Sequence, residues 1–358
     1  MRKVSFPARG EFNKTLQANV EQYFAERGLS RFADWRMFFK TAITLTWLVG
    51  SYVWLVFFSN SLLTAVIAAF AVSQGFVLVG FNIMHDGNHG SYSRSKRINR
   101  IMGFTMDLIG GSTLLWRQKH NILHHTYTNI EGMDDDLDTF GLLRLSPNQE
   151  WRPWHRFQHF YAFLLYSFLT LSWLTFSDFK EFFRRRIGAY EIRKVSGLDT
   201  VLFFLPKLFY YGYMIALPLF FHPLLHVLIA FVGIQLVLGF TLSVVFQLAH
   251  TLEGNTFPEP DDATGRIDNE WAIHQVETTV NFARKNRLAS WYMGGLNFQI
   301  EHHLFPKVCH VHYPAISRIV EENCRAFSVS YVSYPTVRSA VAAHFRFLRM
   351  LGRSPVAA

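Results

Sequence analysis

Residues 41–84 read TAITLTWLVGSYVWLVFFSNSLLTAVIAAFAVSQGFVLVGFNIM and contain no Asp, Glu, Lys or Arg. One transmembrane helix needs about 20 apolar residues to cross a bilayer, so these 44 residues are long enough for two crossings. The polar tripeptide Ser59-Asn60-Ser61 provides a turn near the middle of the stretch. The stretch therefore predicts a hairpin of transmembrane helices over residues 41–58 and 62–84.

A second stretch, residues 208–249, also lacks every charged residue over its 42 positions. His222-Pro223 marks its turn, so we expect helices over residues 203–221 and 224–248. Neither hairpin turn carries Lys or Arg, and cytoplasmic loops are the ones that accumulate these residues. The positive-inside rule then predicts that the N-terminus, the region between the hairpins and the C-terminus are all cytoplasmic.

A third apolar run, FYAFLLYSFLTLSWLTF at residues 160–176, is marginal in length for a span. If it crossed the membrane, the histidine-rich segments before it would face the opposite side from those after the second hairpin. We therefore expect an interfacial helix, because its aromatic residues suit the membrane boundary. The basic run from Lys180 to Arg186 would then meet anionic headgroups.

The pattern as a whole predicts an all-α integral membrane protein, with four transmembrane helices and the remaining helices in the cytoplasm or at the interface. Helical spacing of apolar residues predicts further helices over 11–26, 314–324 and 336–351, and residues 32–39 are typical of an interfacial segment. We expect one domain over residues 1–358, made of N-terminal helices (1–40), the first hairpin (41–84), a middle region with interfacial helices (85–200), the second hairpin (201–249) and a cytoplasmic cap (250–358).

The composition supports a membrane protein. Half of the 358 residues are hydrophobic and 17% are charged, whereas a typical soluble domain carries about 25% charged residues. These proportions argue against a disordered chain and an ordinary soluble enzyme.

The net charge of +9 predicts contact with membrane lipids, and we expect no nucleic-acid partner. Cys309 and Cys324 could form at most one disulfide, so a reducing compartment is the simpler interpretation.

Eight of the 16 histidines form a pattern around the two hairpins. The first cluster, HDGNH at 85–89, has two histidines four residues apart, which share one face of a helix. The second, HNILHH at 120–125, repeats that pair and adds His125, which an α-helix turns about 100° away from His124. The third is QIEHH at 299–303, and His250 ends the fourth predicted helix. A lone HxxxH is a weak signal, but three such clusters in this arrangement are a strong one.

These histidines predict a site for two metal ions. Imidazole suits iron, zinc, copper and nickel, and eight histidines exceed what one ion can use. No cysteine lies in the clusters, which disfavours a thiolate zinc site or an iron–sulfur cluster. Nearby carboxylates could orient the imidazole rings. The candidates for that role are Asp86, Asp134, Asp136, Glu253 and Glu301.

The other eight histidines have simpler interpretations. His222 and His226 lie near the turn of the second hairpin, and His274 is left open because it precedes the third cluster by 25 residues. The remaining five are expected at helix surfaces or at the membrane interface. They are His155, His159, His310, His312 and His344.

The three clusters resemble a known pattern. HDGNH (85–89), HNILHHTYTN (120–129) and LNFQIEHHLFP (296–306) resemble the three histidine boxes of the membrane fatty acid desaturases. Gln299 stands where many relatives have the first histidine of the third box, which resembles the front-end subgroup that includes the Δ6, linoleoyl-type desaturases. TFGLLRLSPNQEW (139–151) and DNEWAIHQVETTVNFA (268–283) are similar to bacterial and cyanobacterial members.

The resemblance implies four transmembrane helices under a cytoplasmic cap and a di-iron centre. It implies an oxidoreductase that acts on paired donors, using O2 and two electrons to insert a cis double bond into a long acyl chain on a glycerolipid or on CoA. Gln299 would bind iron directly or through water. The iron ligands it implies are His85, His89, His120, His124, His125, His250, His302 and His303.

The resemblance also implies an electron donor and a location. A fused cytochrome b5 domain would carry His-Pro-Gly-Gly, which this sequence lacks, so we expect a separate donor such as ferredoxin. A positive cytoplasmic surface would attract an acidic carrier of that kind. The expected location is a bacterial inner or thylakoid-type membrane, with the active site on the cytoplasmic side.

Three other functions remain open at this point. A hydroxylase or ketolase on the same di-iron scaffold would differ only in the fate of the substrate radical. A zinc membrane hydrolase, such as a ceramidase-like lipid amidase, would need about three protein ligands and no electron donor. A receptor or transporter would place polar groups at the bilayer midplane, and the charge-free hairpins count against it.

Overall fold

The computed structural model describes residues 4–192 and 194–353, so residues 1–3 and 354–358 at the ends of the predicted domain lie outside it. The chain divides into two compact units, which alternate along the sequence. Unit 1 comprises Met1–Phe32, Lys119–Ala162 and Val245–Ala358, and unit 2 comprises Ala33–Gln118 and Phe163–Val244. The prediction of a single domain stays a prediction.

Four helical segments are long and apolar enough to cross a membrane: Trp35–Phe58, Leu62–His89, Gly197–Phe220 and Leu224–His250. The predicted all-α membrane fold with two hairpins is therefore confirmed, with each helix a few residues longer than expected. Many large apolar side chains on these helices are exposed, among them Leu62 and Phe220 at 83% each. Such surfaces suit contact with lipid chains rather than with water.

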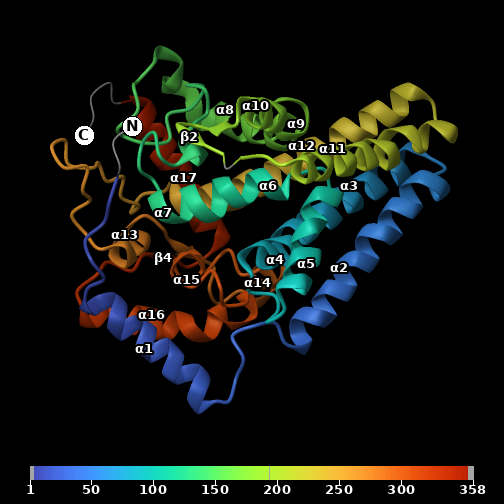
Figure 1. The fold of residues 1–358 in the computed structure, drawn as a ribbon. Coiled ribbons are helices and arrows are strands. Elements are labelled where there is room, and N and C mark those ends of the chain that lie inside the picture. Colours follow the sequence, from blue (N-terminus) through green and yellow to red (C-terminus); the bar gives the residue numbers. More distant parts are fainter. Residues whose placement is uncertain (1–3, 193, 354–358) are drawn as a thin grey trace. The chain divides into compact units, whose positions relative to one another are not determined.

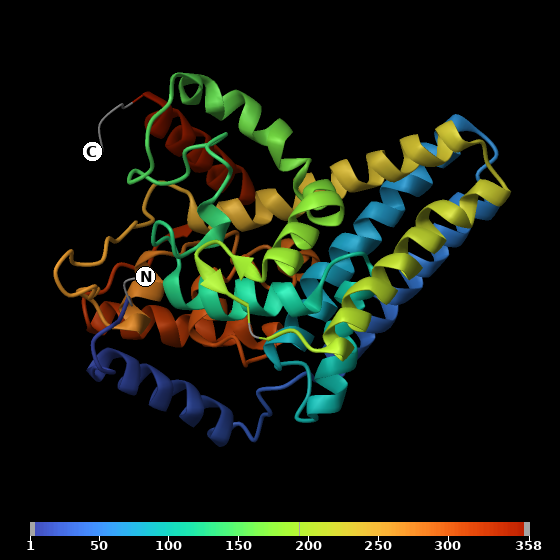
Figure 2. The ribbon, with the colours of Figure 1, turned by 45° about the horizontal axis from the view of Figure 1, so that its top comes forward.

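The first hairpin belongs to unit 2 and begins at a polar cap. Asp34 accepts a hydrogen bond from the backbone N–H of Arg36, and α2 then runs over Trp35–Val53, followed by a π-helical segment at Trp54–Phe58. A capping box between Ser61 and Thr64 starts α3 at Leu62–Leu78. The two helices lie side by side (Figures 1 and 2), and a Cβ at Gly75 would come within 3.0 Å of Leu48.

The second hairpin has helix α11 at Gly197–Tyr211, a π-helical segment at Gly212–Ala216 and a short 3-10 helix at Pro218–Phe220. The turn at His222-Pro223 leads into α12 at Leu224–His250. Gln235 of α12 donates to the hydroxyl of Tyr210 on α11 at 2.6 Å. The helices are therefore joined by a buried polar contact, and the ring of Tyr210 on α11 also lies 6.3 Å from that of Phe231 on α12.

The predicted interfacial helix is broken in two. Segments Pro153–Tyr166 and Leu169–Arg184 meet at an angle of 66°, and they contain helices α8 (Gln158–Tyr166), α9 (Leu169–Ser172) and α10 (Asp178–Arg184). A short antiparallel pair of strands, β1 (Arg186–Ile187) and β2 (Tyr190–Glu191), follows. The interfacial location of the broken helix stays a prediction.

Three shorter helices complete unit 2. The second transmembrane segment continues from α3 through a π-helix at Val79–Met84 into α4 at His85–His89. Helices α5 (Lys96–Leu108) and α6 (Thr113–Trp116) follow. Met84, Met106 and Trp116 from these elements form a buried cluster. The first histidine cluster therefore lies on a helix that is covered by α5.

Unit 1 is built from short helices around one apolar core. Helix α1 (Glu11–Glu26) lies alongside α16 (Tyr313–Ala326) in both views (Figures 1 and 2), with Leu16 and Ile316 fully buried in that core. Helix α1 has the predicted bounds 11–26 and is followed by Gly28 at φ +58°. Unit 1 also contains α7 (His125–Tyr127), α13 (Trp271–Glu277), α14 (Arg287–Tyr292), α15 (Gln299–Leu304), α17 (Val337–Arg353), the 3-10 helices Asp135–Leu137, Pro153–Phe157 and His310–His312, and the parallel strands β3 (Asn281–Phe282) and β4 (Ser333–Tyr334).

Candidate metal centre

Six of the predicted ligands come together within unit 1. A π-helix at Arg117–His124 and helix α7 supply three of them, the end of α12 supplies one, and α15 supplies two. All are buried except His120, which is partly buried. These six residues are His120, His124, His125, His250, His302 and His303.

The six rings form two adjacent groups. Ligand nitrogens of His124, His250 and His303 all lie within 4.8 Å of one another, and the same holds for His125, His302 and His303. The ring centroids of His124 and His250 are 4.6 Å apart, and those of His125 and His302 are also 4.6 Å apart. Two adjacent groups of imidazoles are compatible with a site for more than one metal ion.

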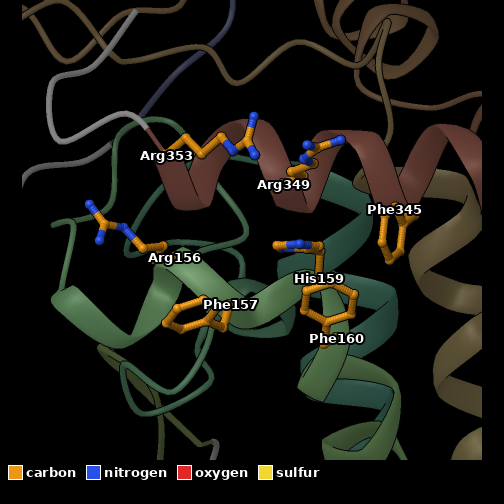
Figure 3. A pocket seen from close by; sticks show the side chains of 7 residues that line it. All are labelled: Arg156, Phe157, His159, Phe160, Phe345, Arg349 and Arg353. Carbon is orange, nitrogen blue, oxygen red and sulfur yellow. The ribbon is translucent and has the colours of Figure 1, made fainter.

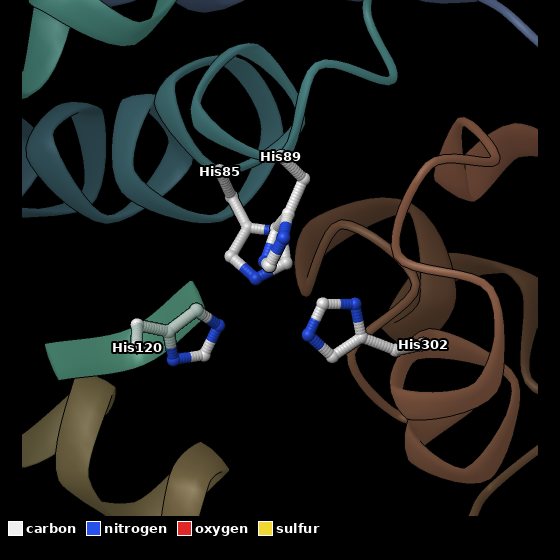
Figure 4. Close-up of side chains that lie close together, drawn as sticks. All are labelled: His85, His89, His120 and His302. Atoms are coloured by element: carbon white, nitrogen blue, oxygen red, sulfur yellow. The ribbon is translucent and has the colours of Figure 1, made fainter. Parts of the chain in front are cut away.

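The second cluster is not α-helical, which corrects one expectation. Arg117–His124 is a π-helix, and its i→i+5 hydrogen bonding brings residues five apart onto one face. The Nε2 atoms of His120 and His125 lie 3.3 Å apart. The expectation that His125 turns away from the other two rings is therefore wrong. The ring of His120 also stacks on that of His302, at 5.8 Å and 17° (Figure 4).

The first cluster lies in unit 2. His85 and His89 leave the same helix one turn apart (Figure 4), with ring centroids 4.7 Å from each other. Trp116 packs edge-on against both rings, at 5.8 and 5.6 Å. Asp86 is buried, with a carboxylate oxygen 4.0 Å from Nδ1 of His85. Trp116 is therefore the side chain that packs against both rings of the pair.

A close helix crossing positions this pair, and the sequence pattern did not predict it. A Cβ at Gly87 would lie 2.4 Å from the backbone nitrogen of Gly103, and a Cβ at Gly103 would lie 2.4 Å from Oδ1 of Asn88. Asn88 also donates to the carbonyl of Gly103 at 3.2 Å. The available signal was the glycine inside HDGNH, because a glycine in a helix is unfavourable unless another backbone approaches it.

Two of the five candidate carboxylates contact a ligand of the larger cluster. Oδ2 of Asp134 lies 3.1 Å from Nδ1 of His124, and Oδ2 of Asp136 lies 3.4 Å from the same atom. Burial lowers the pKa of His124, but Asp134 outweighs it and raises that pKa to about 9. A carboxylate at Nδ1 favours a proton there and leaves Nε2 to bind a metal.

The other carboxylates bond elsewhere. Glu301 is fully buried and accepts hydrogen bonds from Asn281 and Tyr331, both at 2.8 Å. These bonds fix the start of α15, since Asn281 also accepts from the backbone of Ile300 at 3.0 Å. Glu253 forms a two-oxygen ion pair with Arg346 at the surface.

Gln299 lies inside the cluster. Its Nε2 is 3.0 Å from Nε2 of His250 and 3.5 Å from Nε2 of His303. Its Oε1 is buried and has no hydrogen-bond partner among residues 4–192 and 194–353. A buried amide oxygen without a partner is costly, so a metal ion or a metal-bound water at this position would fit it. Imidazoles with one amide oxygen form a donor set that iron accepts.

Further polar residues orient the ligands, and the sequence pattern did not identify them. Oε1 of Gln275 lies 2.7 Å from Nδ1 of His303 and also accepts from Thr128 at 3.0 Å. The hydroxyl of Tyr313 lies 3.2 Å from Nδ1 of His302. These contacts at Nδ1 again leave Nε2 toward the centre of the cluster. The only sequence feature that pointed to Gln275 as a residue orienting a ligand was its position next to His274.

Five of the remaining histidines were expected at helix surfaces or at the membrane interface, but all five are buried, so the expectation of helix-surface positions is wrong. Each is at most 6% exposed, and backbone carbonyls satisfy several of the rings: His155 bonds to Gly141, His312 to Phe32 and His344 to Thr251. His274 is also buried; it packs on Phe6, and burial lowers its pKa to about 4. The buried but unassigned histidines are His155, His159, His310, His312 and His344.

The chain is similar to known proteins over nearly its full length. The family model described as fatty acid desaturase matches residues 60–335. An sn-1 linoleoyl-lipid 6-desaturase from Synechocystis sp. is 38% identical over 359 residues, covering 98% of each chain. A protein of the same name from Arthrospira platensis is 38% identical, covering 99% of this chain and 96% of its own. An acyl-lipid (8-3)-desaturase from Physcomitrium patens is 38% identical over 96% of this chain and 72% of that protein.

Proposed function

Because the chain belongs to the fatty acid desaturase family, we propose that it inserts a cis double bond at the Δ6 position of an acyl chain carried by a glycerolipid. It is a membrane oxidoreductase of this family. Two relatives that match nearly its full length are named sn-1 linoleoyl-lipid 6-desaturases. These names favour a lipid-bound acyl chain over acyl-CoA as the substrate.

One observation in the structure carries this proposal: two adjacent groups of buried histidines meet at His303. The desaturase family uses a di-iron centre. We propose that His120, His124, His125, His250, His302 and His303 bind two iron ions, together with His85 and His89 from the first box. Gln299 would add its amide oxygen, either directly or through water.

Bound iron, with O2 and two electrons, would supply an oxidant strong enough to remove hydrogen from an unactivated methylene pair. The chain's own residues prepare the site for this. Asp134 and Gln275 hold Nδ1 of His124 and His303, so that the opposite nitrogens remain available for metal. The buried surroundings exclude water from the reacting groups.

The orientation and the electron donor are also proposals. The turns at Ser59-Asn60-Ser61 and His222-Pro223 carry no basic residue, which supports a cytoplasmic N-terminus, C-terminus and active site. The membrane would be a bacterial inner or thylakoid-type membrane. An acidic carrier such as ferredoxin would deliver electrons, because a net charge of +9 would accelerate its approach.

The competing functions are not favoured. A zinc hydrolase needs about three protein ligands, whereas six buried or partly buried imidazoles gather in unit 1 alone. A di-iron hydroxylase or ketolase would use a similar site, but the named relatives are desaturases.

The test is expression in a host with defined lipids that contain linoleoyl chains, followed by location of double bonds in each lipid class. We expect a new double bond at carbon 6 of lipid-bound chains, absent from cells that carry His124→Ala. A new hydroxyl or keto product, or a new bond confined to acyl-CoA, would contradict the proposal.

A further inference from the structure

A cavity of about 540 Å³ lies within unit 1, and none of the predicted metal ligands lines it. Helix α17 forms one wall, and the 3-10 helix Pro153–Phe157 with α8 forms the other (Figure 3). Its lining combines basic and aromatic side chains. The residues are Arg156, Phe157, His159, Phe160, Phe345, Arg349 and Arg353.

Helix α17 is joined to residues 144–158 by hydrogen bonds to carbonyl groups near its C-terminal end. Gln158 donates to Leu348 at 2.9 Å, Arg144 to Leu351 at 3.0 Å, and Trp151 to Gly352 at 2.8 Å. A Cβ at position 352 would lie 2.2 Å from the carbonyl oxygen of His155. The backbones therefore touch, and the cavity is a fixed feature of this unit.

Within residues 4–192 and 194–353, the basic side chains of the cavity have no carboxylate partner. Arg349 and Arg353 are four residues apart and share one face of α17, and Arg156 comes from the opposite wall. Among the described residues, none of the three forms an ion pair, and no acidic side chain lines the cavity. Arg346 on the same helix is different, because it pairs with Glu253 at 2.7 Å. Three uncompensated guanidinium groups favour binding of an anion.

His159 gives an independent sign of a missing polar partner. It is 6% exposed, and its ring packs against Phe160 at 4.1 Å and Phe345 at 5.1 Å between centroids. Its Nδ1 is buried, and within the part of the chain that the structure describes it makes no hydrogen bond. A polar atom inside the cavity would remove the cost of that unsatisfied nitrogen.

The rim of the cavity is apolar and exposed. Phe157 is 59% exposed and Phe160 is 68% exposed, and both lie on a broken helix pair that is apolar enough to enter a membrane. Arginine next to exposed aromatic rings is typical of a surface that meets lipid at the headgroup level. An acidic protein would match the arginines but would leave these rings without an apolar partner.

We propose that this cavity binds the phosphate of an anionic glycerophospholipid, with the lipid's acyl chains against Phe157 and Phe160. The three arginines would hold the phosphate oxygens by charge-assisted hydrogen bonds. The site is separate from the histidine clusters, so it does not depend on the assigned reaction.

The test is a binding titration on the full-length protein in detergent with dioctanoyl phosphatidic acid, dioctanoyl phosphatidylcholine and inorganic phosphate. We expect tight binding of the anionic lipid alone. Arg349→Gln and Arg156→Gln should each weaken it about tenfold, the loss of one charge-assisted hydrogen bond. Arg338→Gln is the matched control, because Arg338 is exposed on the same helix but does not line the cavity, and its binding should be unchanged.

Several results would overturn the proposal. If phosphatidylcholine binds as tightly as phosphatidic acid, the site does not select for net negative charge. If inorganic phosphate binds as tightly as phosphatidic acid, the lipid chains do not contribute to binding. Unchanged lipid binding in both cavity variants would show that the arginines are not involved. If those variants bind lipid normally but show a raised KM for reduced ferredoxin, the surface is a docking site for an acidic protein instead.

Discussion

Nε2 of His120 lies 3.3 Å from Nε2 of His125, although an α-helix would place these residues on different faces. The π-helix Arg117–His124 creates the contact. All three histidines of this short segment therefore approach rings of α15, since His120 stacks on His302 and both His124 and His125 lie close to His303. A local departure from α-helical geometry thus gathers the ligands of one segment on the side of α15.

His124→Ala should abolish desaturation and lower the iron content, while the protein remains in the membrane. Its ring lies within 5 Å of those of both His250 and His303. The substitution therefore removes one of the three imidazoles from the group His124, His250 and His303. Iron per chain and product formation are measured on purified protein. Near wild-type turnover in the variant would refute the ligand assignment.

Gln299→His should retain iron and activity, whereas Gln299→Leu should lose most of both. The side chain lies 3.0 Å from His250, and histidine can place a donor nitrogen in the same region, but leucine offers no donor. Iron content and turnover of the two variants are compared. If the leucine variant holds iron as well as the wild type does, Gln299 has no role at the centre.

Asp134→Asn should lower iron affinity by about 10- to 100-fold, because the carboxylate that orients His124 loses its charge. The rate of iron loss to a chelator measures this. Asp138→Asn removes the same charge from an exposed residue of the same loop, and it serves as the control. Equal iron loss from the two variants would point to a general effect of charge instead.

Gly87→Ala should destabilise the protein by about 1–3 kcal/mol, since the new methyl group would meet the backbone of Gly103. Thermal unfolding in detergent measures the change. Gly233→Ala is the control, because nothing lies within 4 Å of a Cβ at that position of α12. If the two variants unfold at the same temperature, α4 and α5 do not cross as closely as Gly87 and Gly103 indicate.

His344 should make stability depend on pH. Burial lowers its pKa to about 4, whereas the unfolded chain titrates near 6.5. Between these values the unfolded state binds more protons, so stability should fall by up to about 3 kcal/mol as pH drops from 6.5 to 4. His344→Asn does not titrate and can still donate to Thr251. Its melting temperature should therefore fall less between pH 7 and pH 5, and an equal fall would contradict the assignment.

The sequence by itself determined the membrane fold and the identity of most candidate ligands. The hairpins were readable because a run of more than 40 residues without charge is long enough for two membrane crossings and too apolar for a soluble surface. Even the turns at Ser59-Asn60-Ser61 and His222-Pro223 were located, since polar residues and proline interrupt the apolar pattern. The candidate ligands could be identified from the spacing of the histidines in the sequence alone.

Only the tertiary structure decided how those residues meet. The π-helix at Arg117–His124 has no signal in the sequence, because apolar periodicity does not separate it from an α-helix. The contacts of Gln275, Tyr313 and Asp134 with the ligand rings join residues from separate elements. Likewise, His155 and His344 are buried because the carbonyl groups of Gly141 and Thr251, respectively, satisfy their rings. Side-chain type and spacing are local properties, whereas the partner that satisfies a buried polar group is chosen by packing.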